Sequence, residues 1–470
     1  MTDMTDADLA ASPSTLDVIV VGAGISGLTA AFRLHKAGRR ITVVDAGARP
    51  GGVIGTVRRD GALYECGPNS TLDTTPLINA MLDDLGIRGE RLDADEVAST
   101  RYVVRDGKAT ALPTSPAAFF TTPAFSLGAK LMLLREPFVR RAPADLEESI
   151  AQFVRRRLGQ EFLDYAIDPF VAGIYAGDPE RISVPAAFPR LHALEQKYGS
   201  LIKGQILGAR ERRKNPEQSK NAAKSFSFKA GMQTLTDALA RAIGGVTSDA
   251  RVTRVALGDD GRWTVDGSRA GEPFTLRARA VVLATPAPTA AALIAPFASA
   301  AARGLAAIDY APVTIVATAY RRADVAHSLA GFGFLVPRKE RRRVLGTLFS
   351  SSMFAGRAPE GTVLLTTFAG GRRDPDVAAL ADEAVVDIVT REHRELLGAS
   401  AAPQWSAVNR WPQAIPQYDL GHLDRLLPAA EAETEWPGLA FCANWRGGVS
   451  VSDCVKNGHA TAERLHTLLG

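Results

Sequence analysis

Three glycines near the N-terminus, Gly22, Gly24 and Gly27, are spaced in the order G-x-G-x-x-G. This spacing is typical of a turn that binds the pyrophosphate of a dinucleotide. The first glycine permits a tight turn, the second lets the backbone approach the phosphates, and the third lets the following helix pack against the strand. The free N–H groups and the positive dipole end of that helix would bind the phosphates.

The residues around this motif supply the elements that it needs. An apolar run at 18–21 predicts a strand buried on both faces, and apolar residues over 28–34 recur at helical spacing. A second strand, at 41–44, leads into Asp45, whose carboxylate can accept hydrogen bonds from ribose hydroxyls. The sequence therefore predicts a dinucleotide site, and the alternative is a glycine turn with a purely structural role.

Two further glycine turns follow this acidic residue. Gly51 and Gly52 precede Val53, and residues 67–70 (Gly-Pro-Asn-Ser) form another turn. Each turn provides one more close approach of the backbone, which an extended site for FAD needs and a site for NAD does not. The sequence therefore favours FAD, although two ordinary loops would produce the same turn signals.

Composition limits the remaining possibilities. The chain has 470 residues, of which 46% are hydrophobic and 23% charged, and this predicts a globular protein of two or three domains. None of the seven histidines lies in a nucleophile or metal motif, and the three cysteines form no C-x-x-C pair, so no metal site is expected. The few cysteines and the polar N-terminus, which does not resemble a signal peptide, predict a cytoplasmic protein.

Charge and hydropathy leave one question open. The net charge of +4 comes largely from local basic clusters, which are solvated surface or attract an anionic substrate or membrane face; no nucleic-acid-binding motif accompanies them. The longest uncharged run, residues 280–302, contains prolines and is too weakly apolar for a membrane span. Residues 119–138 are unusually apolar and have basic residues at their edges. They form either a core helix pair or a peripheral contact with a membrane.

The order of predicted elements indicates an α/β fold with a discontinuous Rossmann-type domain. A hairpin is expected over 101–113, with a type I′ turn at Asp106-Gly107. We predict three interleaved parts: an FAD-binding domain at residues 15–75, 230–300 and 410–470; a mixed α+β substrate-binding domain at 76–100, 195–229 and 301–409; and a helical, membrane-associating domain at 101–194.

Four further stretches carry a family resemblance. They are residues 101–107 (RYVVRDG), 168–179 (DPFVAGIYAGDP), 331–337 (GFGFLVP) leading into 345–351 (LGTLFSS), and 415–418 (IPQY). Together with the glycine motifs, they make nearly the whole chain similar to the oxygen-dependent protoporphyrinogen oxidases. These are flavoenzymes of haem synthesis within the flavin amine oxidase superfamily.

The resemblance implies roles for individual residues. Arg101 would pair with a propionate of the substrate, Gly173 would face the macrocycle through its backbone, and Phe368 would sandwich a pyrrole ring. Phe332 and Leu345 would line the other side. The residues implied in FAD binding are Gly22, Ala23, Gly24, Ile25, Ser26, Gly27, Asp45, Ala46, Gly51, Gly52, Val53, Gly67, Pro68, Asn69, Ser70, Val252, Trp411, Val449, Ser450 and Val451.

The implied activity is the six-electron oxidation of protoporphyrinogen IX to protoporphyrin IX. Hydride would pass to flavin N5 in three two-electron events, with molecular oxygen or a quinone as acceptor, so no catalytic protein side chain is required. The resemblance also implies a tetrapyrrole partner and a homodimer. A coproporphyrinogen III oxidase, a flavin amine oxidase and a non-catalytic flavin- or haem-binding protein remain alternatives.

Overall fold

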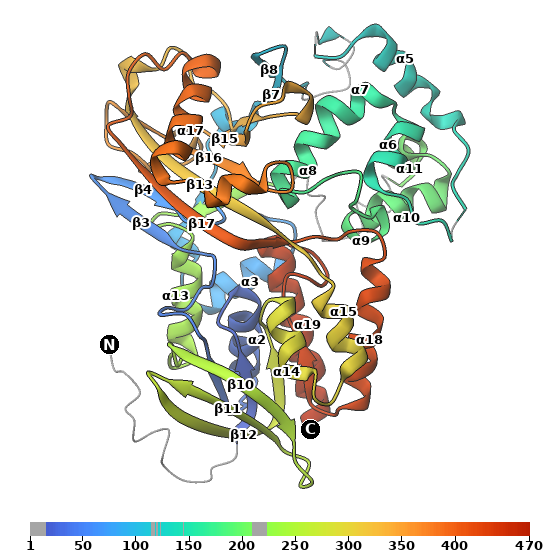
Figure 1. Cartoon of the computed structure of the whole chain (residues 1–470), viewed down its shortest axis with the longest axis vertical. Coiled ribbons are helices and arrows are strands. Elements are labelled where there is room, and N and C mark those ends of the chain that lie inside the picture. Colours follow the sequence, from blue (N-terminus) through green and yellow to red (C-terminus); the bar gives the residue numbers. More distant parts are fainter. Residues whose placement is uncertain (1–15, 114–117, 119–120, 123, 144, 209–222) are drawn as a thin grey trace.

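The computed structural model describes residues 16–113, 118, 121–122, 124–143, 145–208 and 223–470. Figure 1 shows two layered bodies, one above the other, with a group of helices beside the upper one. The lower body contains the dinucleotide sheet, in which β12 lies between β1 and β11 and also pairs with β18. The upper body contains the second, upper sheet, in the order β17-β13-β16-β15-β14-β7-β8. The predicted α/β class is confirmed.

The centre of the dinucleotide sheet is parallel. β1 (Leu16–Val21) lies between β2 (Ile41–Val44) and β12 (Glu272–Leu283), and β18 (Leu439–Phe441) continues the sheet beyond β12. Val18 to Val21 are buried, as expected for a strand covered on both faces. Segments more than 200 residues apart in the chain therefore form one sheet.

Helices cover both faces of this sheet (Figure 1). On one face lie α2 (Ile25–Lys36), α3 (Pro76–Asp84), α13 (Gln233–Ala242) and α19 (Val451–Leu469). On the other lie α14 (Ala287–Ile294), α15 (Ser299–Ala306) and α18 (His422–Glu435). The side chains of β1 alternate between these two cores, Val18 and Val20 facing the first and Ile19 and Val21 the second.

β12 changes partners along its length. Its first half pairs antiparallel with β11 (Trp263–Arg269), which pairs with β10 (Ala250–Leu257), whereas its second half is parallel to β1 and β18. Sequence periodicity indicates two strands here, at 274–277 and 280–284. The structure has one, because no turn residue separates the two halves and the joining residue Ala278 is fully buried.

The upper sheet is mainly antiparallel. Its long strands are β13 (Tyr310–Arg321), β16 (Thr362–Gly370) and β17 (Trp405–Pro416), followed by the short strands β15 (Val344–Leu348) and β14 (Gly333–Leu335). Helix α17 (Asp382–Leu397) packs on one face. The other face is turned toward α8 (Asp168–Tyr175) and carries the apolar residues of the candidate site.

The hairpin β7 (Arg101–Arg105) and β8 (Lys108–Ala111) extends the upper sheet through β14. Its turn has φ of 51° at Asp106 and 73° at Gly107, which confirms the predicted type I′ turn. The hairpin therefore lies in the sheet and not among the helices of the predicted 101–194 segment. Similarly, α3 lies in the core of the dinucleotide sheet, outside the predicted substrate domain.

The helices beside the upper sheet are held by a buried ion network. α5 (Leu127–Arg135) leads to Glu136, whose carboxylate accepts a hydrogen bond from Arg157 Nη1 at 2.6 Å. Arg157, at the end of α6 (Ile150–Arg157), also donates to Glu195 of α10 (Pro189–Tyr198) at 2.6 Å. Because all three side chains are buried, each charge depends on its partners.

One close contact between helices gives a stability prediction. An added Cβ at Gly458 of α19 would lie 2.7 Å from Thr29 Cβ and 2.8 Å from Ser26 O of α2. We expect Gly458→Ala to lower the free energy of unfolding by about 1–3 kcal/mol through overpacking, measured by denaturant titration. The matched control is Gly128→Ala in α5, where the nearest atom is a side-chain oxygen at 3.6 Å. It should raise stability by up to about 1 kcal/mol, and equal effects of the two substitutions would contradict the prediction.

Candidate functional site

The first glycine turn has the shape that its spacing predicts. Gly22 has φ of 109°, and an added Cβ would meet Ala284 O at 2.7 Å; at Gly27 it would meet Gly22 O at 2.0 Å. At Gly24 nothing lies within 4 Å of that position. Gly22 and Gly27 are therefore required by protein packing, whereas Gly24 leaves open space at the surface of the turn.

This open space lies at the N-terminus of α2. Gly24 is the N-cap residue and provides no side-chain acceptor for the first turn of the helix. The N–H groups of the next residues, Ile25 and Ser26, lie in that first turn and have no intrahelical acceptor. An anionic group can approach here without meeting a side chain, which is the fit that a pyrophosphate requires.

The second glycine turn lies directly on the first. Gly51 N donates to Ala23 O at 2.8 Å, and an added Cβ at Gly52 would lie 3.4 Å from Gly24 Cα. The third turn packs against the second, since a Cβ at Gly67 would lie 2.1 Å from Val53 O. The structure thus brings the three predicted turns into one continuous backbone surface.

Asp45 organises the other end of the motif. Its carboxylate accepts hydrogen bonds from Ala23 N at 2.6 Å and from Gly47 N at 2.7 Å. Its backbone N donates to Thr247 O, and its backbone O accepts from Ala250 N, each at 2.9 Å. These bonds hold β10, the strand of Val252, beside Asp45 and Ala46. A carboxylate can accept about four hydrogen bonds, so Asp45 keeps capacity for a ribose.

The C-terminal part of the predicted cofactor site joins the third glycine turn. Ser450 caps α19 by accepting from Asp453 N at 3.2 Å, which places Val449 and Val451 at the start of that helix. Ser452 Oγ lies 3.0 Å from Thr71 Oγ1, next to residues 67–70. The predicted segments 67–70 and 449–451 are therefore neighbours.

Tyr418 fixes the loop that leads into this helix. Its hydroxyl accepts from Gly448 N at 2.9 Å and donates to Asn444 O at 2.8 Å. Its ring stacks on His422 with a centroid distance of 4.1 Å. Burial lowers the pKa of His422 to about 4, so this histidine is neutral at pH 7 and supports the ring of Tyr418. No clear sequence signal identified Tyr418 as a support of the cofactor site.

Two side chains of β17 tie the glycine turns to the upper sheet. Trp411 Nε1 donates to Cys66 O at 2.6 Å, and Asn409 Nδ2 donates to the same oxygen at 2.9 Å. Burial raises the pKa of the Cys66 thiol, which keeps it protonated at neutral pH. Trp411 therefore links the cofactor turns to the face of the sheet that carries Phe368.

That face is apolar. Phe368 of β16 pairs with Ile315 of β13 and with Gly346 of β15, and its side chain is half-buried. Leu345, with 3% of its surface exposed, belongs to the same cluster. The cluster also contains residues of α8, β13 and β17: Ala172, Ala176, Ala311, Val313, Ile315, Trp411, Ala414 and Ile415.

Gly173 of α8 faces this cluster through Leu335. Gly173 is exposed, and an added Cβ would lie 3.0 Å from Leu335 Cδ2. Leu335 is therefore a neighbour of Gly173 that the sequence analysis did not single out. Strand alternation could have found it, because Phe334 is buried in the core on the α17 side and the next residue must point to the opposite face.

Arg101 and Phe332 meet at the neighbouring part of the sheet. β7 is parallel to β14, with Arg101 opposite Gly333, and Arg101 Cζ lies 5.5 Å from the centre of the Phe332 ring. Arg101 is exposed. Phe332 packs in a separate small cluster with Leu348 and Met353, so the structure does not place it among the residues around Phe368. Its predicted role stays a prediction.

In the part of the chain that the structure describes, no group of three or more histidine, cysteine or acidic side chains is arranged to hold a metal ion.

The buried acid Glu65, beside Cys66, accepts from Thr56 Oγ1 and Met232 N and has Arg357 at 3.5 Å. Burial raises the pKa of this carboxyl. Its contacts indicate a structural role at the junction of the two sheets.

Comparison with known proteins places these features in a family. A profile of the flavin-containing amine oxidoreductases matches residues 25–466. The chain is 33% identical to protoporphyrinogen oxidase 2 of Arabidopsis thaliana over 96% of this chain and 94% of that protein. It is 28% identical to coproporphyrinogen III oxidase of Bacillus subtilis over 96% and 98%, respectively.

A crystal structure from Exiguobacterium sp. 255-15, assigned provisionally as a protoporphyrinogen oxidase, has the same fold. Its TM-score is 0.81 at 23% identity, covering 97% of this chain and 100% of that one. The family profile, the relatives and the continuous surface of the glycine turns agree. The chain belongs to the flavin-containing amine oxidoreductase family, and its cofactor is FAD.

Proposed function

We propose that this protein oxidises protoporphyrinogen IX to protoporphyrin IX, with oxygen as the electron acceptor. The observation that carries the proposal is the apolar face around Phe368, joined to the cofactor turns through the Trp411–Cys66 hydrogen bond. A large tetrapyrrole with a mostly apolar ring system matches such a surface. Relatives named for porphyrinogen oxidation support the choice of substrate class.

Bound FAD would supply the hydride acceptor for this chemistry. The protein's own residues bind and orient the substrate. Arg101 offers a planar guanidinium to a propionate, while Phe368, Leu345 and the backbone of Gly173 contact the macrocycle and exclude water. The protons released come from pyrrole nitrogens and can pass to solvent, so no side chain has to act as a strong base.

Coproporphyrinogen III is the second candidate substrate, because relatives carry both names. It bears more carboxylates than protoporphyrinogen IX and would need more cations around the macrocycle. Arg101 is the cation that we assign to the substrate. We rank protoporphyrinogen IX first because relatives named for it are 33–34% identical to this chain, against 28–31% for relatives named for coproporphyrinogen III.

Parallel turnover assays separate these candidates. The purified yellow protein is mixed in air with each porphyrinogen, and porphyrin fluorescence is followed. We expect a higher kcat/KM for protoporphyrinogen IX. A preference for coproporphyrinogen III would retain the flavin chemistry but change the substrate, and no porphyrin from either would overturn the proposal.

Arg101→Ala tests the propionate contact. Loss of one charge-assisted hydrogen-bonding partner should raise KM by roughly 10- to 100-fold, equivalent to about 1.4–2.7 kcal/mol. Bound FAD, measured by visible absorption, should be unchanged. The matched control is Arg254→Ala, an exposed arginine on the dinucleotide sheet, which should leave KM unaltered. Equal KM values for the two variants would remove Arg101 from the substrate site.

Gly24→Val tests the cofactor cradle. Its side chain would occupy the open space at the start of α2, so we expect the affinity for FAD to fall by more than about 100-fold, or about 2.7 kcal/mol, in titrations of the flavin-free protein. Stability of the flavin-free protein should fall by no more than about 1 kcal/mol, because valine is a poorer N-cap residue than glycine but nothing outside the local chain lies within 4 Å of the added Cβ. Gly89→Val, at another glycine with nothing within 4 Å, should change neither quantity. Normal FAD affinity in Gly24→Val would contradict the assignment.

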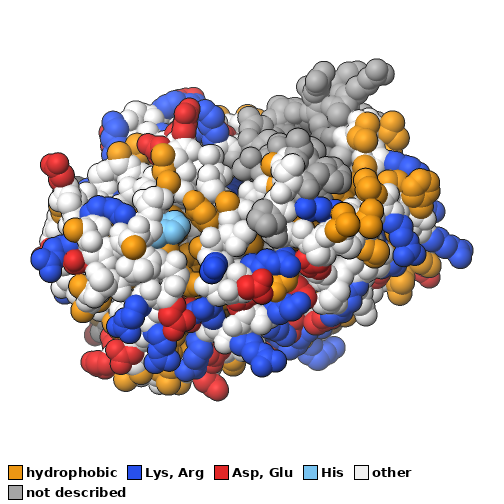
Figure 2. Space-filling model, turned by 90° about the horizontal axis from the view of Figure 1, so that it is seen from above, with side chains coloured by type: hydrophobic (Ala, Val, Ile, Leu, Met, Phe, Trp, Pro, Cys, Tyr) orange, Lys and Arg blue, Asp and Glu red, His pale blue; other side chains and the backbone are white. Residues whose placement is uncertain are grey.

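We also propose that α5 rests on the inner face of an anionic membrane. Four large apolar side chains of this region are exposed, and the basic residues nearby would face lipid headgroups. The apolar residues are Leu127, Leu131, Leu134 and Phe138, and the basic ones are Arg135, Arg140 and Arg141. Figure 2 shows hydrophobic side chains gathered at the right-hand edge. Among the residues described, no helix is long and apolar enough to cross a membrane.

Flotation with anionic vesicles tests this contact. The double variant Leu127→Glu/Leu131→Glu should reduce the bound fraction by about tenfold or more, because two apolar anchors are lost and two negative charges are added. The control, Leu423→Glu/Leu427→Glu, changes two exposed leucines with the same spacing on α18 and should still float. Wild-type protein that stays at the bottom of the gradient would rule out the membrane contact.

A further inference from the structure

Both ends of α8, the helix of Gly173, have unusual backbone conformations. A π-helical turn, Leu163–Ile167, leads directly into α8. At its C-terminus Ala176 adopts a left-handed conformation with φ of 47°. π-turns are common at functional sites, and a non-glycine residue in this region persists only where its surroundings hold it there.

The N-terminal end of α8 is held by Arg373, which follows strand β16 and Phe368. Arg373 Nη2 donates to Asp168 Oδ2 at 2.8 Å and to Asp168 O at 3.1 Å, while Nη1 donates to Val336 O at 2.5 Å. Asp168 Oδ2 also accepts from Arg338 N at 2.7 Å. Both side chains are more than nine-tenths buried, so each ion needs the other.

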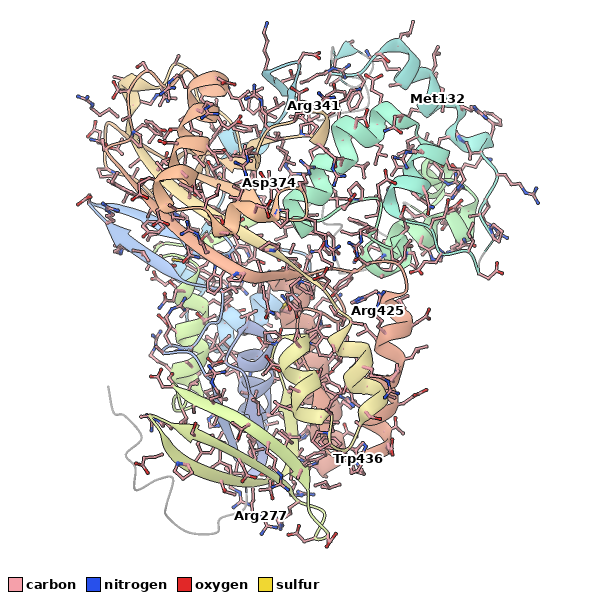
Figure 3. All side chains as sticks on the ribbon, in the orientation of Figure 1. Met132, Arg277, Arg341, Asp374, Arg425 and Trp436 are labelled. Atoms are coloured by element: carbon pink, nitrogen blue, oxygen red, sulfur yellow. The ribbon has the colours of Figure 1, made fainter. Side chains whose placement is uncertain are left out.

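The same turn holds the other end of the helix. Arg372 N donates to Ala176 O at 2.8 Å, and a Cβ at Gly371 would lie 2.5 Å from that oxygen. Gly371 has φ of 67°, a conformation that suits glycine. Residues 371–373 therefore contact both ends of α8. Figure 3 labels the next residue, Asp374, where the upper sheet faces this helix.

These contacts between residues 371–373 and α8 lie on the proposed substrate side of the protein. Val336, bound by Arg373, follows Leu335, the residue opposite Gly173. The strand that carries Phe368 runs into the turn itself. Asp168 and Arg373 thus connect the helix on one side of the apolar face with β14 and β16 on the other, without touching the substrate residues themselves.

We propose that Asp168 and Arg373 are positioning residues, whose ion pair sets the separation between Gly173 on α8 and Leu335 and Phe368 on the sheet. This separation is the width available to the macrocycle. The proposal rests on the proposed porphyrinogen oxidation, since it assigns a structural determinant to that same site.

A double-mutant cycle tests the pair. Asp168→Asn, Arg373→Gln and the double variant are compared with wild type for KM, kcat, bound FAD and thermal midpoint, using protoporphyrinogen IX. Each single substitution should raise KM about tenfold with kcat changed less than about threefold, because the cofactor turns are untouched. The double variant should resemble the worse single variant, since the two residues act as one unit. Arg373→Lys, which retains the charge but not the forked geometry, should lie between wild type and Arg373→Gln.

The matched control is Arg342→Gln, which breaks a somewhat less buried pair, with Glu392 on the α17 side of the same sheet. It should lower the thermal midpoint and leave KM unchanged. An Arg373→Gln variant that behaves like this control, or KM effects that multiply in the double variant, would overturn the positioning role. If Arg373→Gln does not fold, Arg373→Lys with normal KM would overturn it instead. Wild-type protein that neither oxidises protoporphyrinogen nor binds protoporphyrin would reject the proposed function first, and the inference with it.

Discussion

The carbonyl of Cys66 accepts two hydrogen bonds from the upper sheet, one from Trp411 and one from Asn409. This oxygen belongs to the backbone that leads into Gly67, which packs on Val53 and thereby on the glycine turn around Gly24. The two sheets have cores of their own, and these bonds are among the contacts that join them. Any reaction between a cofactor on one sheet and a substrate on the other depends on the register that these bonds maintain.

The discontinuous topology explains how one chain builds such a junction. Each sheet is completed by segments far apart in sequence, so the chain passes between the two bodies several times (Figure 1). β17 contributes Trp411, from within the strand, to the cofactor side, and β16 runs into the turn that holds α8. Binding energy for a large substrate can then come from fixed walls rather than from mobile loops.

Local backbone structure could be predicted from the sequence, whereas contacts between distant segments could not. The roles of Gly22 and Gly27 and the turn at Asp106-Gly107 follow from backbone sterics over a few residues, so spacing alone identified them. Leu335 was missed because its direction depends on how a three-residue strand sits in the sheet. The Asp168–Arg373 pair joins residues 205 positions apart, and nothing in the residue types indicated that either would be buried beside the other.

Anaerobic mixing tests the central claim most directly, namely that a porphyrinogen bound against the upper sheet reduces the flavin held by the glycine turns. The yellow protein is mixed with protoporphyrinogen IX without oxygen, and flavin absorbance is followed in a stopped-flow instrument. The account predicts rapid bleaching that depends on substrate concentration, porphyrin formation matching the flavin reduced, and recovery of the yellow colour when oxygen is admitted. Flavin that stays oxidised in the presence of saturating porphyrinogen would contradict it.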